Sequence, residues 1–284
     1  MTLEATMNEK AQLVVHFLGA WFEAKHKELP GLSRLRSSVR YSLLQEGGKR
    51  FRPVLAMMTA EALGTPPARI LPYAAAVECV HTYSLIHDDL PAMDNDDFRR
   101  GQPTNHKKFD EATAILAGDA LLTEAFEIIS SSYSEEAGLA GRAISELARA
   151  SGLRGMVGGQ AVDMAAKKES ISLEDLRTMH SLKTGALIRA SAVGAAILSR
   201  ATEPRVKEIA NYAECLGLAF QVADDLLDYD QAKPEPGSYP ALLGPEKTKA
   251  FLCDLTDKCI VSLKDWTHAD PLIQLALYNQ SRSL

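Results

Sequence analysis

The stretch from Ile70 to Asp89, ILPYAAAVECVHTYSLIHDD, repeats apolar residues at intervals of three and four. This spacing matches one face of an α-helix, which has about 3.6 residues per turn. The stretch from Glu208 to Tyr229, EIANYAECLGLAFQVADDLLDY, has the same pattern. Glycine- and proline-containing breaks separate further segments of helix length, and alternating strand patterns are scarce. We therefore expect one all-α domain over residues 1–284, with about ten helices around a central cavity.

The composition supports helices and limits the classes of function. Apolar residues make up 46% of the chain and aromatic residues only 6%, and alanine and leucine dominate the apolar share. This bias favours helix over strand. The net charge of −6 argues against nucleic acid as the main partner. It also disfavours an anionic substrate unless metal ions accompany it.

The cysteines and the N-terminus indicate a cellular location. The 4 cysteines form no CxxC pair, and scattered reduced thiols fit the cytoplasm. The opening MTLEATMNEK lacks the basic and apolar regions of a signal peptide. No apolar run approaches the length that a membrane span needs. We expect a cytoplasmic protein without a membrane span.

An acidic cluster lies near the end of the second helical stretch, in QVADDLLD. Because a helix turns by about 100° per residue, Asp224, Asp225 and Asp228 share one face, with Gln221 one turn earlier. That face borders the apolar stripe, as it would on the rim of a lined cavity. The solvated edge of an amphipathic helix is the alternative interpretation of this pattern taken alone.

A second acidic cluster, HDDLPAMDNDDFRRG, follows the first helical stretch. Asp88 and Asp89 end the helical pattern, and Pro91 disfavours its continuation. We expect a local bulge that brings Asp94 back toward Asp88 at the C-terminal end of the helix. Because a helix C-terminus carries partial negative charge, carboxylates there require a cation. Mg²⁺ fits, since it takes oxygen ligands and is often shared between carboxylates and substrate phosphates.

Cationic residues accompany these acids. Arg99 and Arg100 can supply bidentate donors to phosphate groups. The segment EGGKRFRP places Lys49, Arg50 and Arg52 in a glycine-led loop before Pro53, where we expect a helix to begin. Cations at a helix N-terminus form an anion site, although a basic surface turn would have the same sequence.

Two weaker signals agree with a phosphate site. His81 lies about two helical turns before Asp88 on the same face. The segment LKTGALI places Lys183 and Thr184 beside Gly185, where a helix could bend and present both side chains. Metal-binding acids combined with cations suit a polyphosphate ligand.

Taken in order, GGKRxRP, DDxxxxD followed by RRG, the KT pair and GLAFQxxDDxLD resemble the trans-polyprenyl diphosphate synthases, and most closely the bacterial farnesyl diphosphate synthases. The resemblance extends from roughly residue 40 to residue 230. It implies an isoprenoid-synthase fold, a homodimer, and Mg²⁺ or Mn²⁺ as cofactor. It also implies condensation of an allylic diphosphate with isopentenyl diphosphate to farnesyl diphosphate. A geranylgeranyl diphosphate synthase, and a weakly active or non-catalytic subunit of a heteromeric synthase, remain alternatives.

The resemblance also implies roles for individual residues. The metal ligands or their supports would be Asp88, Asp89, Asp94, Asp224, Asp225 and Asp228. The allylic diphosphate would contact Arg99, Lys183, Thr184 and Gln221. Isopentenyl diphosphate would contact Lys49, Arg52, His81 and Arg100. The length of the product would depend on Tyr83 and Ser84. The residues expected to matter most for catalysis are Asp88, Asp89, Asp94, Lys183 and Asp224.

The chain departs from the family pattern after the second acidic cluster. The stretch YDQAKPEPGSYPALLG is shorter than the usual loop and lacks the lysine that precedes a TYP segment. Lys233 is a candidate substitute. A phosphohydrolase with a His/Asp metal centre and a terpene cyclase of the same fold are further alternatives. A phosphohydrolase would leave the second acidic cluster and GGKRxRP without a role. A terpene cyclase would leave the isopentenyl site without one.

Overall fold

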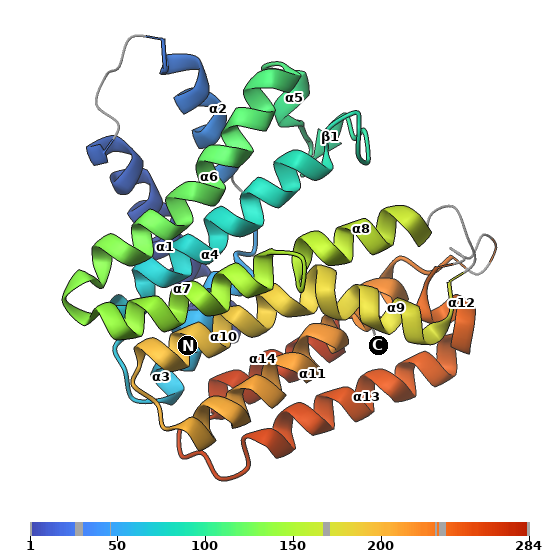
Figure 1. Ribbon diagram of the computed structural model, residues 1–284. Coiled ribbons are helices and arrows are strands. Elements are labelled where there is room, and N and C mark those ends of the chain that lie inside the picture. The colour runs from blue at the N-terminus through green and yellow to red at the C-terminus, as the bar shows by residue number, and fades with distance from the viewer. Residues whose placement is uncertain are drawn as a thin grey trace. The chain divides into compact units, whose positions relative to one another are not determined.

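A computed structural model describes residues 2–25, 31–45, 47–166, 171–230, 232 and 237–282 (Figure 1). The described residues are helical apart from turns and one hairpin of two short strands, which confirms the all-α class. The chain forms two compact units, of which the first comprises Met1–Met57 and Ala68–Ile144. The second comprises Met58–Pro67 and Ser145–Leu284. The expectation of a single domain over the whole chain stays a prediction.

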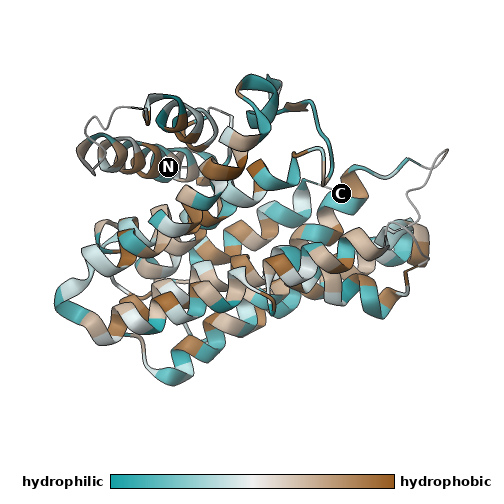
Figure 2. Cartoon of the chain, turned by 45° about the horizontal axis from the view of Figure 1, so that its top comes forward, coloured by the Kyte–Doolittle hydropathy of each residue, from teal (hydrophilic) through white to brown (hydrophobic). Residues whose placement is uncertain are grey.

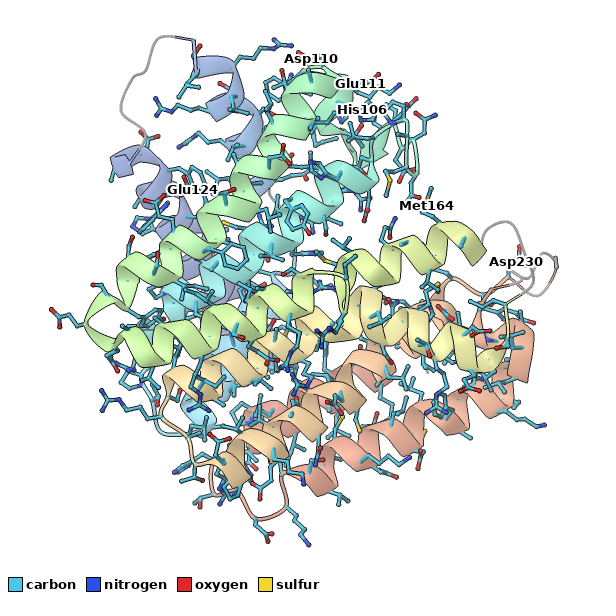
Figure 3. All side chains as sticks on the ribbon, viewed as in Figure 1. His106, Asp110, Glu111, Glu124, Met164 and Asp230 are labelled. Atoms are coloured by element: carbon cyan, nitrogen blue, oxygen red, sulfur yellow. The ribbon has the colours of Figure 1, made fainter. Side chains whose placement is uncertain are left out.

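The first unit contains the first acidic cluster. Its elements, some of which end in the second unit, are α1 (Leu3–Lys25), α2 (Ser33–Leu43), α3 (Phe51–Ala62), α4 (Pro67–Asp88), β1 (Phe98–Arg99), β2 (Gln102–Pro103), α5 (Asn105–Lys108), α6 (Glu111–Ser132), the 3₁₀ turn η1 (Ser134–Glu136) and α7 (Ala137–Ser151). Helices α2 and α5 pack against α6. Figure 3 shows Asp110 and Glu111 at the start of α6 and Glu124 further along it.

Helices α4 and α6 approach closely where α6 has a glycine. A Cβ atom on Gly118 would lie 2.1 Å from Nε2 of His87, so no larger residue fits there without displacement. The same nitrogen lies 3.1 Å from the carbonyl oxygen of Ile115 on α6. His87 therefore fixes the C-terminal end of α4, where the acidic cluster begins, against α6.

The second unit contains the second acidic cluster. Its elements are α8 (Met156–Ala166), α9 (Leu173–His180), the π-helical turn η2 (Ser181–Gly185), α10 (Ala186–Leu198), α11 (Glu203–Leu227), α12 (Tyr239–Leu243), α13 (Pro245–Ser262) and α14 (Asp270–Ser281). Helix α11 packs against α10, α13 and α14 (Figure 1). Hydrophobic and hydrophilic residues are interspersed along these helices (Figure 2), as amphipathic helices require.

The structure corrects one helix boundary. Helix α3 begins at Phe51, two residues before the proline at which the sequence predicts its start. The reason is that the N–H of Val54 already donates to the carbonyl oxygen of Arg50, at 3.0 Å. Pro53 thus lies inside the first turn, where a missing N–H carries no penalty.

One stretch of the second unit reaches the length and hydropathy of a membrane span. The stretch Leu173–Leu198 contains a window of mean hydropathy 1.2. The expectation that no apolar run approaches that length was therefore wrong for this stretch. The window is 72% buried inside the structure, and a helix that is apolar on most sides is expected in a protein core.

Candidate active site

The first acidic cluster forms a turn at the end of α4. Asp88 is the last residue of the helix, and the N–H of Asp94 donates to the carbonyl oxygen of Asp88 at 2.9 Å. The N–H of Met93 donates to the carbonyl oxygen of Leu90 within the same turn. The bulge predicted from Pro91 is therefore confirmed, and it returns Asp94 to the helix end.

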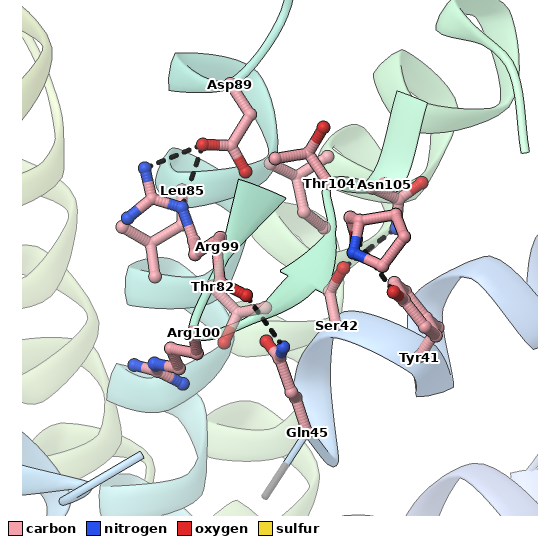
Figure 4. Close-up of a pocket in the computed structure, with 12 residues that line it drawn as sticks. Tyr41, Ser42, Gln45, Thr82, Leu85, Asp89, Arg99, Arg100, Thr104 and Asn105 are labelled. Carbon is pink, nitrogen blue, oxygen red and sulfur yellow. Dashed lines mark hydrogen bonds and ion pairs between the residues drawn. The ribbon is translucent and has the colours of Figure 1, made fainter. Parts of the chain in front are cut away.

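Asp89 has a cationic partner in the first unit. Its side chain is buried, and Oδ1 accepts from Nε of Arg99 at 2.8 Å and lies 2.6 Å from Nη2 (Figure 4). Burial raises the pKa of Asp89, and the hydrogen bond from Arg99 offsets this only in part. A carboxylate predicted to bind metal and an arginine predicted to bind phosphate thus hold each other in place.

The β1–β2 hairpin sends its two arginines in different directions. Residues Arg100 and Gly101 form its two-residue loop, with φ angles of 53° and 74°. Positive φ at both positions is typical of a type I′ turn, whose twist matches paired strands. Arg99 reaches Asp89, whereas the guanidinium of Arg100 lies against Gly48, where a Cβ atom would be 2.6 Å from Nη1. Within the described part of the chain, no carboxylate forms an ion pair with Arg100.

The glycine-led loop before α3 divides its cations between two roles. Arg50 is buried and donates to Oε1 of Glu78 at 2.5 Å. It also donates to the carbonyl oxygens of Leu43 and Gln45, each at 2.8 Å. Arg50 therefore anchors the loop, and among the loop's cations Lys49 and Arg52 remain the candidates for ligand binding.

His81 lies in a strongly positive environment. Nη1 of Arg52 is 3.3 Å from its Nε2 atom. Burial lowers the pKa of His81 well below its ordinary value, and the charges of Arg52, Arg100, Arg50 and Arg99 lower it further. The imidazole is therefore neutral among guanidinium groups. A bound anion would be stabilised there by these cations, so His81, Arg52 and Arg100 are brought together as the sequence predicts.

The residues proposed to control product length lie on the same helix. Tyr83 is 6% exposed, and its ring meets the ring of His87 edge-on, with centroids 5.8 Å apart. Burial and the charge of Asp88 raise the pKa of Tyr83 to about 12, so its hydroxyl stays neutral. The Ser84 hydroxyl donates to the carbonyl oxygen of His81 at 2.9 Å.

In the second unit, Lys183 and Thr184 lie on the π-helical turn η2. This departure from the regular α-helix lies beside Gly185, where the sequence predicts a bend, and such π-bulges are frequent at functional sites. A Cβ atom on Gly159 would lie 2.2 Å from the backbone nitrogen of Lys183, so α8 approaches the turn closely. Nζ of Lys183 lies 2.5 Å from Oδ2 of Asp163 on α8.

The π turn also contacts α11. The hydroxyl of Thr184 donates to Oε1 of Gln221. A Cβ atom on Gly217 would lie 2.9 Å from Cα of Gly185, so two glycines permit this approach. The structure therefore brings Thr184 and Gln221 together, as the predicted allylic site requires.

The three aspartates of the second cluster make different contacts. Oδ1 of Asp224 accepts from Nη2 of Arg282 at 2.6 Å. Oδ2 of Asp225 accepts from the backbone N–H of Tyr239 at 2.9 Å. Asp228 caps α11, and its N–H donates to the carbonyl oxygen of Asp224. Lys233, the candidate substitute for the family lysine, lies outside the described residues.

The donors present fit Mg²⁺ chemically. Both clusters offer hard carboxylate oxygens. Across the described part of the chain, no three His, Cys, Asp or Glu side chains are grouped closely enough to hold an ion by themselves. Mg²⁺ commonly keeps several waters and takes only one or two carboxylates together with substrate phosphates. A site of that kind needs no closed cluster of three protein ligands.

Three supporting residues were not predicted: His87, Asp163 and Arg282. The signals for the first two are indirect, because a glycine within a helix, as in ILAGDALL, marks a close approach, and GGQAVDM combines such glycines with an acid. The contact of Arg282 depends on how α14 packs against α11, and no local pattern shows it.

Comparisons with known proteins identify the class. The model of the polyprenyl synthetase family matches residues 33–237. The farnesyl diphosphate synthase of Geobacillus stearothermophilus is 44% identical over 268 residues, covering 88% of this chain and 89% of that protein. Geranylgeranyl pyrophosphate synthase 7, chloroplastic, of Arabidopsis thaliana is 42% identical over 266 residues, covering 88% and 76% of the two chains.

Solved structures similar to this chain support the same family. The apo structure of an FPP/GFPP synthase from Zymomonas mobilis matches with a TM-score of 0.89 and 39% identity, covering 97% of this chain and 98% of that one. A geranyltransferase from Legionella pneumophila matches with a TM-score of 0.89 and 33% identity, covering 99% and 98%. The fold is therefore that of the isoprenoid synthases. The chain belongs to the polyprenyl synthetase family, and its activity is that of a trans-prenyltransferase of the farnesyl and geranylgeranyl diphosphate synthase type.

Proposed function

We propose that the chain condenses dimethylallyl or geranyl diphosphate with isopentenyl diphosphate to give farnesyl diphosphate and diphosphate. The observation that carries this proposal is the acidic turn at the end of α4 in the same unit as the cations around His81. Carboxylates suited to Mg²⁺ and guanidinium groups suited to phosphate are the two components that a diphosphate substrate requires.

Residues of both units are given roles in the proposal. Mg²⁺ would be held, directly or through their neighbours, by Asp88, Asp89 and Asp94 in the first unit and by Asp224, Asp225 and Asp228 in the second. Arg99, Lys183, Thr184 and Gln221 would hold the allylic diphosphate, and Lys49, Arg52, His81 and Arg100 would hold isopentenyl diphosphate. Lys183 and Arg99 are already aligned by Asp163 and Asp89, so little side-chain freedom is lost when phosphate binds.

The chemistry follows from the charges. Breaking the allylic C–O bond leaves negative charge on the diphosphate and positive charge on the allyl group. When bound, Mg²⁺ would supply charge stabilisation at the leaving oxygens. Arg99 and Lys183 would add preorganised donors to the same oxygens. The double bond of isopentenyl diphosphate then attacks the allylic carbon, and the departing diphosphate accepts the proton that is lost.

A neutral His81 suits its proposed role. Its depressed pKa means that it carries no charge at neutral pH, so it binds as a hydrogen-bonding group while the arginines supply the charge. The phosphohydrolase alternative needs an imidazole available for metal or water. His87, the histidine of the HDD sequence, instead contacts the carbonyl oxygen of Ile115.

A farnesyl product is favoured over geranylgeranyl diphosphate by one observation. Ser84 lies on α4 about one turn before Asp88, on the wall along which a growing chain would descend, and its neighbour Tyr83 is a bulky, buried side chain that would form the floor. We further propose a cytoplasmic homodimer in which the whole chain acts as one domain, with Mn²⁺ able to replace Mg²⁺.

Product analysis tests the proposed function. The purified chain is incubated with isopentenyl diphosphate, Mg²⁺ and dimethylallyl, geranyl or farnesyl diphosphate in turn, with EDTA in parallel. We expect farnesyl diphosphate from the first two allylic substrates and no product in EDTA. Turnover that persists in EDTA would rule out the metal-dependent reaction. A complete lack of product with every allylic substrate would favour the non-catalytic subunit.

Replacing Tyr83 by alanine should lengthen the product. Each isoprene unit adds roughly one helical turn, ~5 Å, to the chain, so one large side chain can decide where elongation stops. We expect Tyr83→Ala to form C20 or longer products, measured by chromatography of the dephosphorylated alcohols. Tyr83→Phe is the matched control, because it keeps the ring and should leave the C15 product dominant. The same product from both variants would place the floor of the pocket elsewhere.

A further inference from the structure

Arg282, which follows α14 as its C-terminal cap, is held by four side-chain contacts in the second unit. One of them is a hydrogen bond from Nη2 to the carbonyl oxygen of Phe220, at 3.4 Å. Nη2 donates to Oδ1 of Asp224 at 2.6 Å, and Nε donates to Oδ1 of Asn279 at 3.1 Å. The guanidinium carbon lies 4.4 Å from the centroid of the Phe220 ring, within the range of a cation–π interaction. Asn279 is only 1% exposed, so Arg282 is fixed by the protein and not only by its ion pair.

The packing of α14 on α11 sets the position of this arginine. Near the start of α14, the hydroxyl of Tyr212 donates to the carbonyl oxygen of Leu272 at 2.7 Å. At the end of α14, Arg282 reaches Asp224. The two contacts are about three turns apart on each helix and follow the same direction, so α14 lies parallel to α11. Arg282 therefore reaches the acidic cluster because the fold directs it there.

The electrostatics of the cluster explain why a cation is useful at this position. Asp224 is adjacent to Asp225, and Asp228 lies one turn later, so three carboxylates repel one another. The bond from Arg282 involves Oδ1 of Asp224. A carboxylate can accept several hydrogen bonds or ligands on its two oxygens. Pairing with Arg282 is therefore compatible with metal binding by the same carboxylate.

We propose that Arg282 is a positioning residue that holds the carboxylate of Asp224 in the orientation needed to bind Mg²⁺ together with a diphosphate group. This inference rests on the proposed function and adds a residue that lies beyond the part of the chain matched by the family model, which ends at residue 237. Partners of metal ligands typically change metal affinity or activity by about tenfold to a hundredfold when they are removed.

The test compares the Mg²⁺ dependence of three variants by two measurements. The first is the melting temperature of the full chain with inorganic diphosphate as probe, at increasing Mg²⁺. The second is the rate of prenyl transfer across the same Mg²⁺ series. For Arg282→Ala we expect the half-saturating Mg²⁺ concentration to rise by about tenfold or more in both. Arg282→Lys should restore part of this loss, because it keeps the charge without the fork of donors.

Arg205→Ala is the matched control. Arg205 also pairs with an acid, Glu208, at 2.9 Å, and lies 4.8 Å from the Trp266 ring, but it is near the start of α11, away from the acidic cluster. We expect its Mg²⁺ dependence to equal that of the unaltered chain. If Arg282→Ala fails to fold, as judged by circular dichroism, Arg282→Gln keeps most of the side-chain volume and replaces it in both measurements.

Two results would overturn the inference. One is an unchanged or lower half-saturating Mg²⁺ concentration for Arg282→Ala, since a lower value would mean that the arginine competes with the metal. The other is an equal rise for Arg205→Ala. Failure of the proposed function is a separate outcome, because it would appear as no prenyl product from the unaltered chain while the stabilisation by Mg²⁺ and diphosphate still reports on Arg282.

Discussion

Replacing Asp88 by alanine is expected to lower kcat by about 10²–10³-fold, the usual cost of removing one preorganised electrostatic group from a reacting centre. Asp88 lies at the C-terminal end of α4, where the helix already carries partial negative charge. A further carboxylate is favourable there only if a cation binds. The expected loss is therefore in catalysis and not in folding.

The measurement is the steady-state rate with geranyl and isopentenyl diphosphates at saturating Mg²⁺, with circular dichroism to confirm the helical fold. Asp97→Ala is the matched control. Asp97 belongs to the same acidic stretch but is exposed and lies 2.8 Å from Nζ of Lys107. We expect the control to keep the rate of the unaltered chain. Similar rates for both variants would show that the acidic turn does not bind the reacting diphosphate.

The helices that carry the site could be predicted because their patterns are local. Apolar residues at helical spacing define α4 and α11, and Pro91 forces the turn that returns Asp94 to Asp88. At Gly185 the sequence predicts a bend from one glycine, and the structure has a π-helical turn there. Apolar periodicity and proline determine the backbone conformation within a few residues, so their effects can be predicted from the local sequence.

The pairing of neighbouring cations could not be predicted, because it depends on the tertiary fold. Arg50 and Arg52 are two positions apart in one basic loop, yet Arg50 is buried against Glu78 while Arg52 contacts His81. Side chains two positions apart point in different directions, and only the tertiary fold decides which of the two arginines meets the acid. For the same reason, no sequence pattern connects Arg282 with Asp224 across 58 positions.

The structure also shows that two of the predicted metal ligands have partners within the protein. Asp89 is paired with Arg99, and Asp225 accepts from the backbone of Tyr239. In each cluster, then, one carboxylate has a contact that orders a neighbouring segment, namely the β1–β2 hairpin or the start of α12. Adjacent aspartates on a helix point about 100° apart, so different partners for the two members of each pair follow from helix geometry.

Replacing Arg50 by alanine should destabilise the first unit by about 3–5 kcal/mol, the cost of leaving a buried charge without its partner. The side chains of Arg50 and Glu78 are 3% and 1% exposed. Without the guanidinium, the carboxylate of Glu78 would stay buried with no counter-charge. The carbonyl oxygens of Leu43 and Gln45 would also lose their donor at the end of α2.

Urea unfolding followed by circular dichroism measures this effect. Arg40→Ala is the matched control, since Arg40 pairs with Glu23 at 2.7 Å but the two side chains are 40% and 62% exposed. An exposed pair contributes about 0–1 kcal/mol, because water and salt screen its charges. We expect the urea midpoint to fall far more for Arg50→Ala than for Arg40→Ala. Because Lys49 and Arg52 lie in the same loop as Arg50, loss of the Arg50 side chain should also weaken the binding of isopentenyl diphosphate by the molecules that stay folded. Equal midpoints would show that the burial of Arg50 contributes nothing to stability.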